Sequence, residues 1–309
     1  MAQGATLESA IRFPSPPPAL AARLKLRERK LQMLPAVAVE AMRLAKDPNC
    51  SIPQFAAVVE RDVKLATDIL RISNSALYSP TVPIKSLRQA VVRLGLDGCQ
   101  NLILTSSIAS LMKRVSEEQV RVSTVLWQHS YDTGTLAQQL NATFRFGFKG
   151  EEFAAGLIHD FGRILLAIAE PEKFADGDPM DFIETPEKLA HEDEVLGTDH
   201  CRLGGWYAAS QHLPPPFPEV MLCHHEPETS KNHQHLTALV AVADHMSNHM
   251  QRYKMVAGYD PGSNPFLPFL AKFGDAHFET KFADVASKLM ETAMADLETI
   301  KTVFTSSES

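Results

Sequence analysis

The sequence of 309 residues contains no apolar run that approaches the roughly 20 residues needed to cross a bilayer, which excludes a membrane-spanning helix. Its first residues lack a positively charged region followed by an apolar core, so no secretory signal is predicted. Cysteine is scarce too, and the four residues form no CxxC motif (Cys50, Cys99, Cys201 and Cys223). Such spacing is typical of reduced thiols and not of a disulfide framework. These absences together predict a cytoplasmic protein.

An excess of positive charge is missing as well, because 30 basic residues face 37 acidic ones and the net charge is −7. Proteins that bind nucleic acid displace counterions with many exposed Lys and Arg side chains, so we expect no nucleic-acid partner. The motifs GxxxxGKS, GxxxxGKT, GxSxG and HExxH are absent, and no GxGxxG follows a strand. Hydrophobic residues make up 45% of the chain and charged residues 22%, which is typical of a globular protein with a sizeable core.

The alternation of apolar and polar residues that indicates strands is not found either. Apolar residues instead recur every three to four positions along most of the chain, which predicts an all-α fold. In the first half, Ser51 and Asp62 are expected to cap two successive helices, and Gly95 separates two more. The predicted helices from there on cover residues 84–94, 96–112, 122–142, 151–169 with a break at His159-Asp160, 192–212, 220–225, 236–252 and 280–304.

Four segments have a different character. The first 18 residues end in FPSPPP, which predicts a flexible or extended arm because proline fixes φ and lacks an N–H group. The basic stretch 23–30 predicts a solvated first helix, with docking to a partner as the lesser alternative. Residues 170–191 are rich in Asp, Glu and Pro and predict a surface loop with at most short helical pieces. The amphipathic stretch 280–304 is expected to pack in the core or against another subunit.

The polar pair His159-Asp160 interrupts the apolar helical run 154–168. Burying a neutral polar group without a partner costs roughly 2 to 7 kcal/mol, and burying a charge costs far more. The pair therefore either binds a ligand or belongs to a buried hydrogen-bond network. Other polar residues in or beside apolar helices are candidate companions of the pair: His129, His200, His224, His225 and Asp244.

Imidazole and carboxylate ligands from several helices suit Fe, Mn, Ni or Zn. One metal set would comprise His129, His159, Asp160 and Asp244, and a second ion would be held by His200, His224 and His225. Two such ions can clamp a phosphate and activate water. Arg163 is expected to attract an anion or brace Asp160, and Asp132 to orient His129. The alternative is that each histidine is an ordinary core or surface residue, which we expect for His245 and for the histidines in polar or loop settings (His191, His212, His233, His235, His249 and His277).

Seven segments carry a family likeness: residues 34–79 and 82–104, then LWQHS, AAGLIHDFGRILL, LGTDHCRLGGWYA, LPPPFPEVMLCHH and VAVADHM. They resemble the HDOD domain, the HD-related output domain of bacterial signalling proteins, over residues 31–250. The resemblance implies a two-lobed helical protein. An N-terminal helical lobe would cover 31–120 and an HD-like lobe 121–250. Residues 1–30 would then be the arm and basic helix, and 251–309 a loop and helix that complete the HD-like lobe.

The resemblance also implies site roles. His129 matches the first histidine of the HD pattern, His159-Asp160 the HD pair, and Asp244 the closing aspartate. His200 and His224-His225 match further metal ligands of the HD-GYP branch, which degrades cyclic di-GMP. The sequence departs from that branch because HHE is followed by PETSKNHQH, with no GYP motif.

The sequence is therefore consistent with two main functions and leaves a third possible. The family pattern and the missing GYP motif favour a regulatory module that binds one or two metal ions, engages a protein partner and has no turnover. The alternative is a metal-dependent phosphohydrolase acting on a nucleotide or cyclic dinucleotide. A metal-free scaffold is the third, because a carboxylate–imidazole network can satisfy itself.

Overall fold

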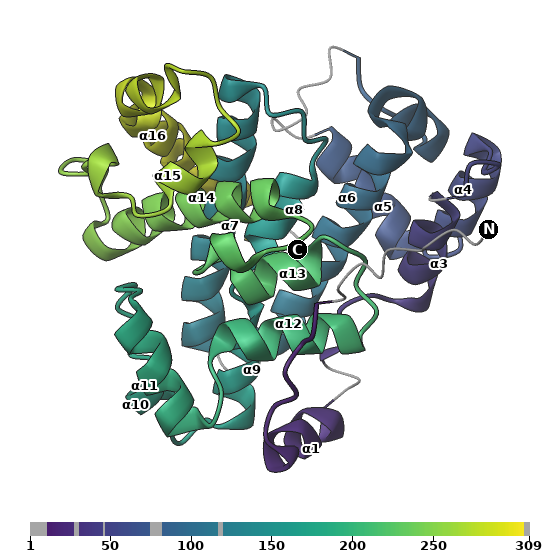
Figure 1. Cartoon of the computed structure of the whole chain (residues 1–309). Coiled ribbons are helices and arrows are strands. Elements are labelled where there is room, and N and C mark those ends of the chain that lie inside the picture. Colours follow the sequence, from purple (N-terminus) through teal and green to yellow (C-terminus); the bar gives the residue numbers. More distant parts are fainter. Residues whose placement is uncertain (1–10, 28–30, 46, 75–81, 117–119, 306–309) are drawn as a thin grey trace, which may run out of the picture.

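The structure, a computed structural model, describes residues 11–27, 31–45, 47–74, 82–116 and 120–305. Every regular element within these ranges is an α-helix or a short 3-10 helix, which confirms the expected all-α fold (Figure 1). Among the described helices, none combines the length and the apolar character that a bilayer crossing requires.

The region expected to form the first lobe contains four helices: α3 (Ala36–Ala45), α4 (Ile52–Val59), α5 (Val63–Ser73) and α6 (Leu87–Ser116). Ser51 caps α4 as expected, in a reciprocal capping box with Gln54. Asp62 caps α5 by accepting a hydrogen bond from the backbone N–H of Leu65 at 2.9 Å. Gly95 has a φ of 74° and a ψ of 174°, so α6 bends where the two predicted helices meet.

In the region expected to form the second lobe, α7 (Val120–Phe144) contacts α8 (Glu151–Ile158), α14 (Gln234–Tyr253) and α16 (Phe278–Thr305). Beside it, α12 (His200–Ser210) packs against both α9 (Phe161–Ala169) and α13 (Phe217–Cys223). The predicted amphipathic C-terminal helix is α16, and its buried face joins the core through Phe278, Phe282, Ala286, Met290 and Ala293. Further short helices are α10 (Phe174–Gly177) and α15 (Leu267–Ala271).

The expected single helix 192–212 is wrong. The structure has α11 (Pro186–Leu196) and α12 instead, separated by Gly197, which adopts a left-handed φ of 82°. Asp199 then caps α12 by accepting a hydrogen bond from the N–H of Arg202 at 2.7 Å. Glycine and aspartate are stop and start signals that the continuing apolar pattern concealed. Because of this break, His200 is the first residue of α12.

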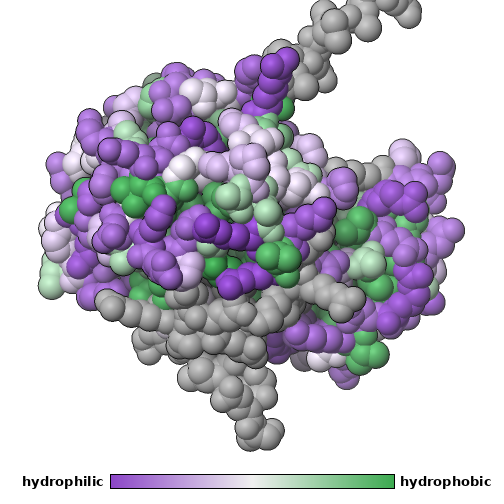
Figure 2. Space-filling model, turned by 90° about the horizontal axis from the view of Figure 1, so that it is seen from below, coloured by the Kyte–Doolittle hydropathy of each residue, from purple (hydrophilic) through white to green (hydrophobic). Residues whose placement is uncertain are grey.

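The basic stretch 23–30 forms the end of α1 (Pro18–Leu26), where Arg23 and Lys25 are exposed and the apolar residues Leu20 and Leu24 are buried. Residues 28–30 lie outside the described part of the chain. Arg23 and Arg27 donate hydrogen bonds to the carbonyl oxygens of Ala169 and Ile168 at the end of α9. Cations near the last carbonyls of a helix are favoured by its dipole. In the view from below, the surface is mostly hydrophilic, with hydrophobic residues in separate patches (Figure 2).

Candidate metal centre

Six helices bring the predicted site residues together. His129 lies on α7, and Asp244 lies on α14. The pair His159-Asp160 forms the junction of α8 and α9. The start of α12 and the end of α13 supply the remaining histidines, and all of these side chains are at most 7% exposed (His129, His159, Asp160, His200, His224, His225 and Asp244). That they bind a metal stays a prediction.

The first half of the centre contains His129, His159 and Asp244. Asp244 Oδ1 lies 3.0 Å from Nε2 of His129 and 3.3 Å from Nε2 of His159. The two Nε2 atoms are 3.3 Å apart. Three atoms from three helices therefore converge on one point.

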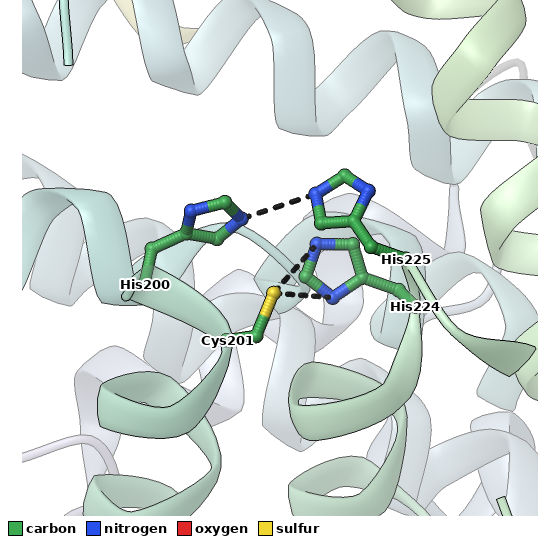
Figure 3. A group of neighbouring side chains, drawn as sticks. All are labelled: His200, Cys201, His224 and His225. Carbon is green, nitrogen blue, oxygen red and sulfur yellow. Dashed lines mark hydrogen bonds between the residues drawn. The ribbon is translucent and has the colours of Figure 1, made fainter. Parts of the chain in front are cut away.

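The second half contains His200, His224 and His225. The Nε2 atoms of His200 and His225 are 3.2 Å apart (Figure 3). Asp160 connects the halves, since its Oδ1 lies 3.4 Å from His200 Nε2 and 3.6 Å from His224 Nε2. Its Oδ2 lies 3.5 Å from Nε2 of His129 in the first half.

The outer nitrogens of the rings determine which tautomers are present. Nδ1 of His159 lies 2.7 Å from the carbonyl oxygen of Gly156, and Nδ1 of His224 lies 2.9 Å from that of Met221. A carbonyl oxygen only accepts, so each Nδ1 donates and each neutral ring has its lone pair on Nε2. This arrangement of the second nitrogen is common in metal-binding histidines.

His129 and His200 are oriented by side chains instead of carbonyls. Nδ1 of His129 lies 3.0 Å from Ser247 Oγ, which donates its own hydrogen to the carbonyl oxygen of His129 at 3.1 Å. Nδ1 of His200 lies 2.8 Å from Glu192 Oε2, which also accepts the backbone N–H of His200 at 2.8 Å. Both rings therefore also direct Nε2 toward the carboxylates.

This geometry places nitrogen lone pairs against carboxylate lone pairs, a contact that requires a proton or a metal cation between them. Within the described residues, Asp160 Oδ1 and Asp244 Oδ2 are buried without a hydrogen-bond donor. Ligand atoms about 2.1 Å from a shared ion lie roughly 3.0 to 3.4 Å from one another, close to the distances found. The residues therefore fit a divalent cation and could hold one.

The charges of the centre are consistent with this fit. Burial opposes ionisation of Asp160, but His159 and Arg163 hold its pKa well below the usual range. Burial alone would lower the pKa of His159, yet the carboxylates of Asp160 and Asp244 outweigh it and the pKa is raised. Burial and the neighbouring histidines lower the pKa of His225 well below the usual range, so its ring is neutral. A cation would replace protons held between these groups.

Arg163 braces Asp160, one of the two roles expected for it. Its NH1 lies 3.1 Å from Asp160 Oδ2 and 3.0 Å from Glu184 Oε1. Its Nε and NH2 donate to both carboxylate oxygens of Asp178, at 2.7 and 2.8 Å. Asp132 is buried on the same helix as His129, and its expected role in orienting that ring stays a prediction.

Sequence reasoning missed Glu184, Glu192 and Ser247. Glu184 lies within the acidic stretch 170–191, and Glu192 directly follows it. This stretch has no helical periodicity, which is why it was expected to be a surface loop. That expectation is wrong for Asp178 and Phe182, which are buried beside the centre. The only sequence signal for the two glutamates is that acidic residues precede the helix that carries His200.

Cys201 lies against His224, with Sγ 3.8 and 4.0 Å from the two ring nitrogens (Figure 3). Burial raises the pKa of Cys201 to about 12, so the residue is a protonated thiol. This agrees with the expectation of a small buried residue. His245 is directed away from the centre, with Nδ1 3.4 Å from the hydroxyl of Tyr259.

Comparison with known proteins identifies relatives of this chain. The family profile described as HDOD domain matches residues 31–227. An uncharacterized protein of Treponema pallidum (strain Nichols) is 26% identical over 230 residues, which cover 73% of this chain. The match covers 44% of that protein, so the chain spans less than half of its length.

Two solved structures resemble the chain over most of their lengths. An HDOD domain protein of unknown function from Geobacter sulfurreducens has a TM-score of 0.65 and 21% identity, over 89% of this chain and 97% of that one. A protein of Shewanella amazonensis SB2B, provisionally assigned as a metal-dependent phosphohydrolase, has a TM-score of 0.54 and 20% identity, over 89% and 97%. At these identities the likeness shows the fold.

Proposed function

This chain belongs to the HDOD family, and from that premise we propose that it is a bacterial signal-transduction regulator that binds metal without turnover. Its partner would be another protein, and its location the cytoplasm. The observation that supports the proposal is how little space adjoins the centre on the Arg163 side. The cavity there measures about 30 Å³ and is lined by Arg163, Phe182, Glu184 and His200. Such a volume holds about one or two water molecules and no phosphate ester.

A bound divalent ion would supply the positive charge that stabilises the facing carboxylates and imidazoles. Imidazole and carboxylate ligands suit Fe, Mn, Ni or Zn. The residues that would hold it come from α7, α12, the end of α13 and the α8–α9 junction, with Asp244 from α14. Because these helices make up most of the second lobe, occupancy of the centre would fix their relative positions. A partner that docks on this lobe would then respond to the metal state.

A specific observation favours the alternative function, a metal-dependent phosphohydrolase. A second cavity of about 1110 Å³ is lined by His225 and Cys201, together with Arg202 and Lys231. That volume exceeds what a nucleotide-sized ligand requires. A phosphate ester in this cavity would approach the centre at His225.

The deciding experiment is metal analysis followed by an activity assay. Protein purified without a metal-affinity column, both aerobically and anaerobically, is expected to contain one or two equivalents of iron, manganese, nickel or zinc. It should show no hydrolysis of cyclic dinucleotides or of a chromogenic phosphodiester. Turnover that depends on the bound metal would establish the hydrolase instead.

A double variant tests the assignment of the site. His159→Ala with Asp160→Ala removes two ligands, one of which, Asp160, connects the halves, so bound metal should be lost while the first lobe stays folded. Metal content measured by mass spectrometry and circular dichroism in the far ultraviolet check this result. Unchanged metal stoichiometry in the double variant would show that the metal lies elsewhere.

A further inference from the structure

Glu184 contacts the centre although it lies on the loop between α10 and α11. Its Oε2 is 3.4 Å from Nε2 of His225 and accepts a hydrogen bond from Asn248 at 2.9 Å. Its other oxygen, Oε1, is 3.0 Å from Arg163 NH1. Ligand atoms of Asp160, Glu184 and His225 lie within 4.8 Å of one another. The carboxylate therefore has the position of an additional ligand of the second half.

The loop that carries Glu184 is fastened to the centre. Asp178 at its start makes the two-point contact with Arg163. Phe182 lies between the guanidinium of Arg163, 4.9 Å from the ring centre, and the ring of His129, 4.9 Å between centroids. Met180 and Phe182 have φ values of 58° and 53°, which bulky residues adopt only where their surroundings require it. The loop conformation is thus held by contacts with the centre.

A further cavity, of about 470 Å³, lies on the outer side of this loop and is lined by Asn248, Arg252 and Tyr259. Phe182, Ile183 and Glu184 line both this cavity and the small space beside Arg163. These three residues therefore lie between the outer cavity and the centre. Arg252 also lines the outer cavity, beside the carboxylates of Glu184 and Asp260.

We propose that Glu184 is a removable ligand from within the chain, occupying the position at which an external oxyanion of the phosphate class would bind the metal centre. The inference rests on the proposed metal-binding function. It adds that Glu184 prevents external ligands from reaching the centre. Glutamate and phosphate both offer oxygen atoms to a cation and to Arg163. If Glu184 moves toward the outer cavity, a phosphate ion would take the place of its carboxylate beside the cation and Arg163.

The test uses full-length protein loaded with Mn²⁺, its metal content verified, and titrated with inorganic phosphate in a calorimeter. Glu184→Ala should bind phosphate at least about tenfold more tightly than the unaltered protein, because the competing carboxylate is gone. Glu187→Ala is the matched control, since this exposed glutamate lies three residues further along and does not contact the centre. It should bind phosphate as the unaltered protein does.

Glu184→Gln is the second variant, in case the alanine variant does not fold. It keeps the volume of the side chain and loses its charge, so it should also bind phosphate more tightly. Equal phosphate affinity in the unaltered protein and the folded Glu184 variants would overturn the inference while leaving the metal centre intact. Complete loss of metal from those variants would also overturn it, because the glutamate would then be an essential ligand. An unaltered protein that cannot be loaded would instead refute the proposed function.

Discussion

At the scale of single residues, Asp160 and Glu192 have different tasks in the centre. Asp160 presents its two oxygens to different histidines, so it joins the halves directly. Glu192 lies outside and accepts two hydrogens from His200, one from the ring and one from the backbone. A carboxylate in this position fixes the ring orientation and raises the basicity of the opposite nitrogen.

Replacing Glu192 should therefore weaken metal binding without removing a ligand. We expect Glu192→Ala to lower metal affinity by about 10- to 100-fold. Glu192→Gln should retain much of the affinity, because its amide oxygen can still accept from His200. Competition with a fluorescent chelator measures both affinities. Similar losses in the two variants would mean that the charge of Glu192, and not its hydrogen bonds, supports the site.

At the scale of elements, the close approach of α9 and α12 places His200 next to Asp160. A Cβ atom added at Gly162 would lie only 1.9 Å from the carbonyl oxygen of His200. Only glycine permits this separation, and the contact involves backbone atoms that cannot rotate away. The glycine thus sets the distance between two helices that both supply site residues.

Gly162→Ala should consequently destabilise the protein by about 3 kcal/mol or more, because one helix must shift away from the other. Urea unfolding followed by circular dichroism gives the difference in free energy. Gly262→Ala is a suitable control, since its added Cβ would meet only Asp260 Oδ1 at 3.4 Å. If both variants unfold at the same urea concentration, the two helices are not held by this contact.

Helix content and the histidine set were predictable because both depend on local information. Ser51 and Asp62 mark the starts of their helices because their side chains cap the first turn. His159-Asp160 is recognisable as a polar pair within an apolar run. The break before His200 was concealed because Gly197 interrupts the helix without interrupting the apolar spacing. The inward course of Glu184 depends on Arg163, 21 residues away in sequence, and no local pattern encodes such a contact.

At the scale of the whole molecule, the centre connects helices from residue 129 to residue 244, so metal binding should stabilise the folded chain as a unit. A ligand that binds only the folded state adds about 2.7 kcal/mol at a concentration 100 times its Kd. We expect the thermal midpoint to rise with added Mn²⁺ and to fall with chelator. The His159→Ala, Asp160→Ala double variant should show neither change, and differential scanning calorimetry can test this directly.

The packing of α1 against α9 has a mechanical consequence. Nine residues of α-helix form a rod about 13 Å long, and α9 is such a rod. One end of it begins beside Asp160 and carries Arg163, while the arginines of α1 hold the carbonyl oxygens at the other end. The hydrogen bonds from α1 and the carboxylate shared by both halves of the centre therefore lie at opposite ends of one helix, so a displacement of α9 along its own axis would alter both.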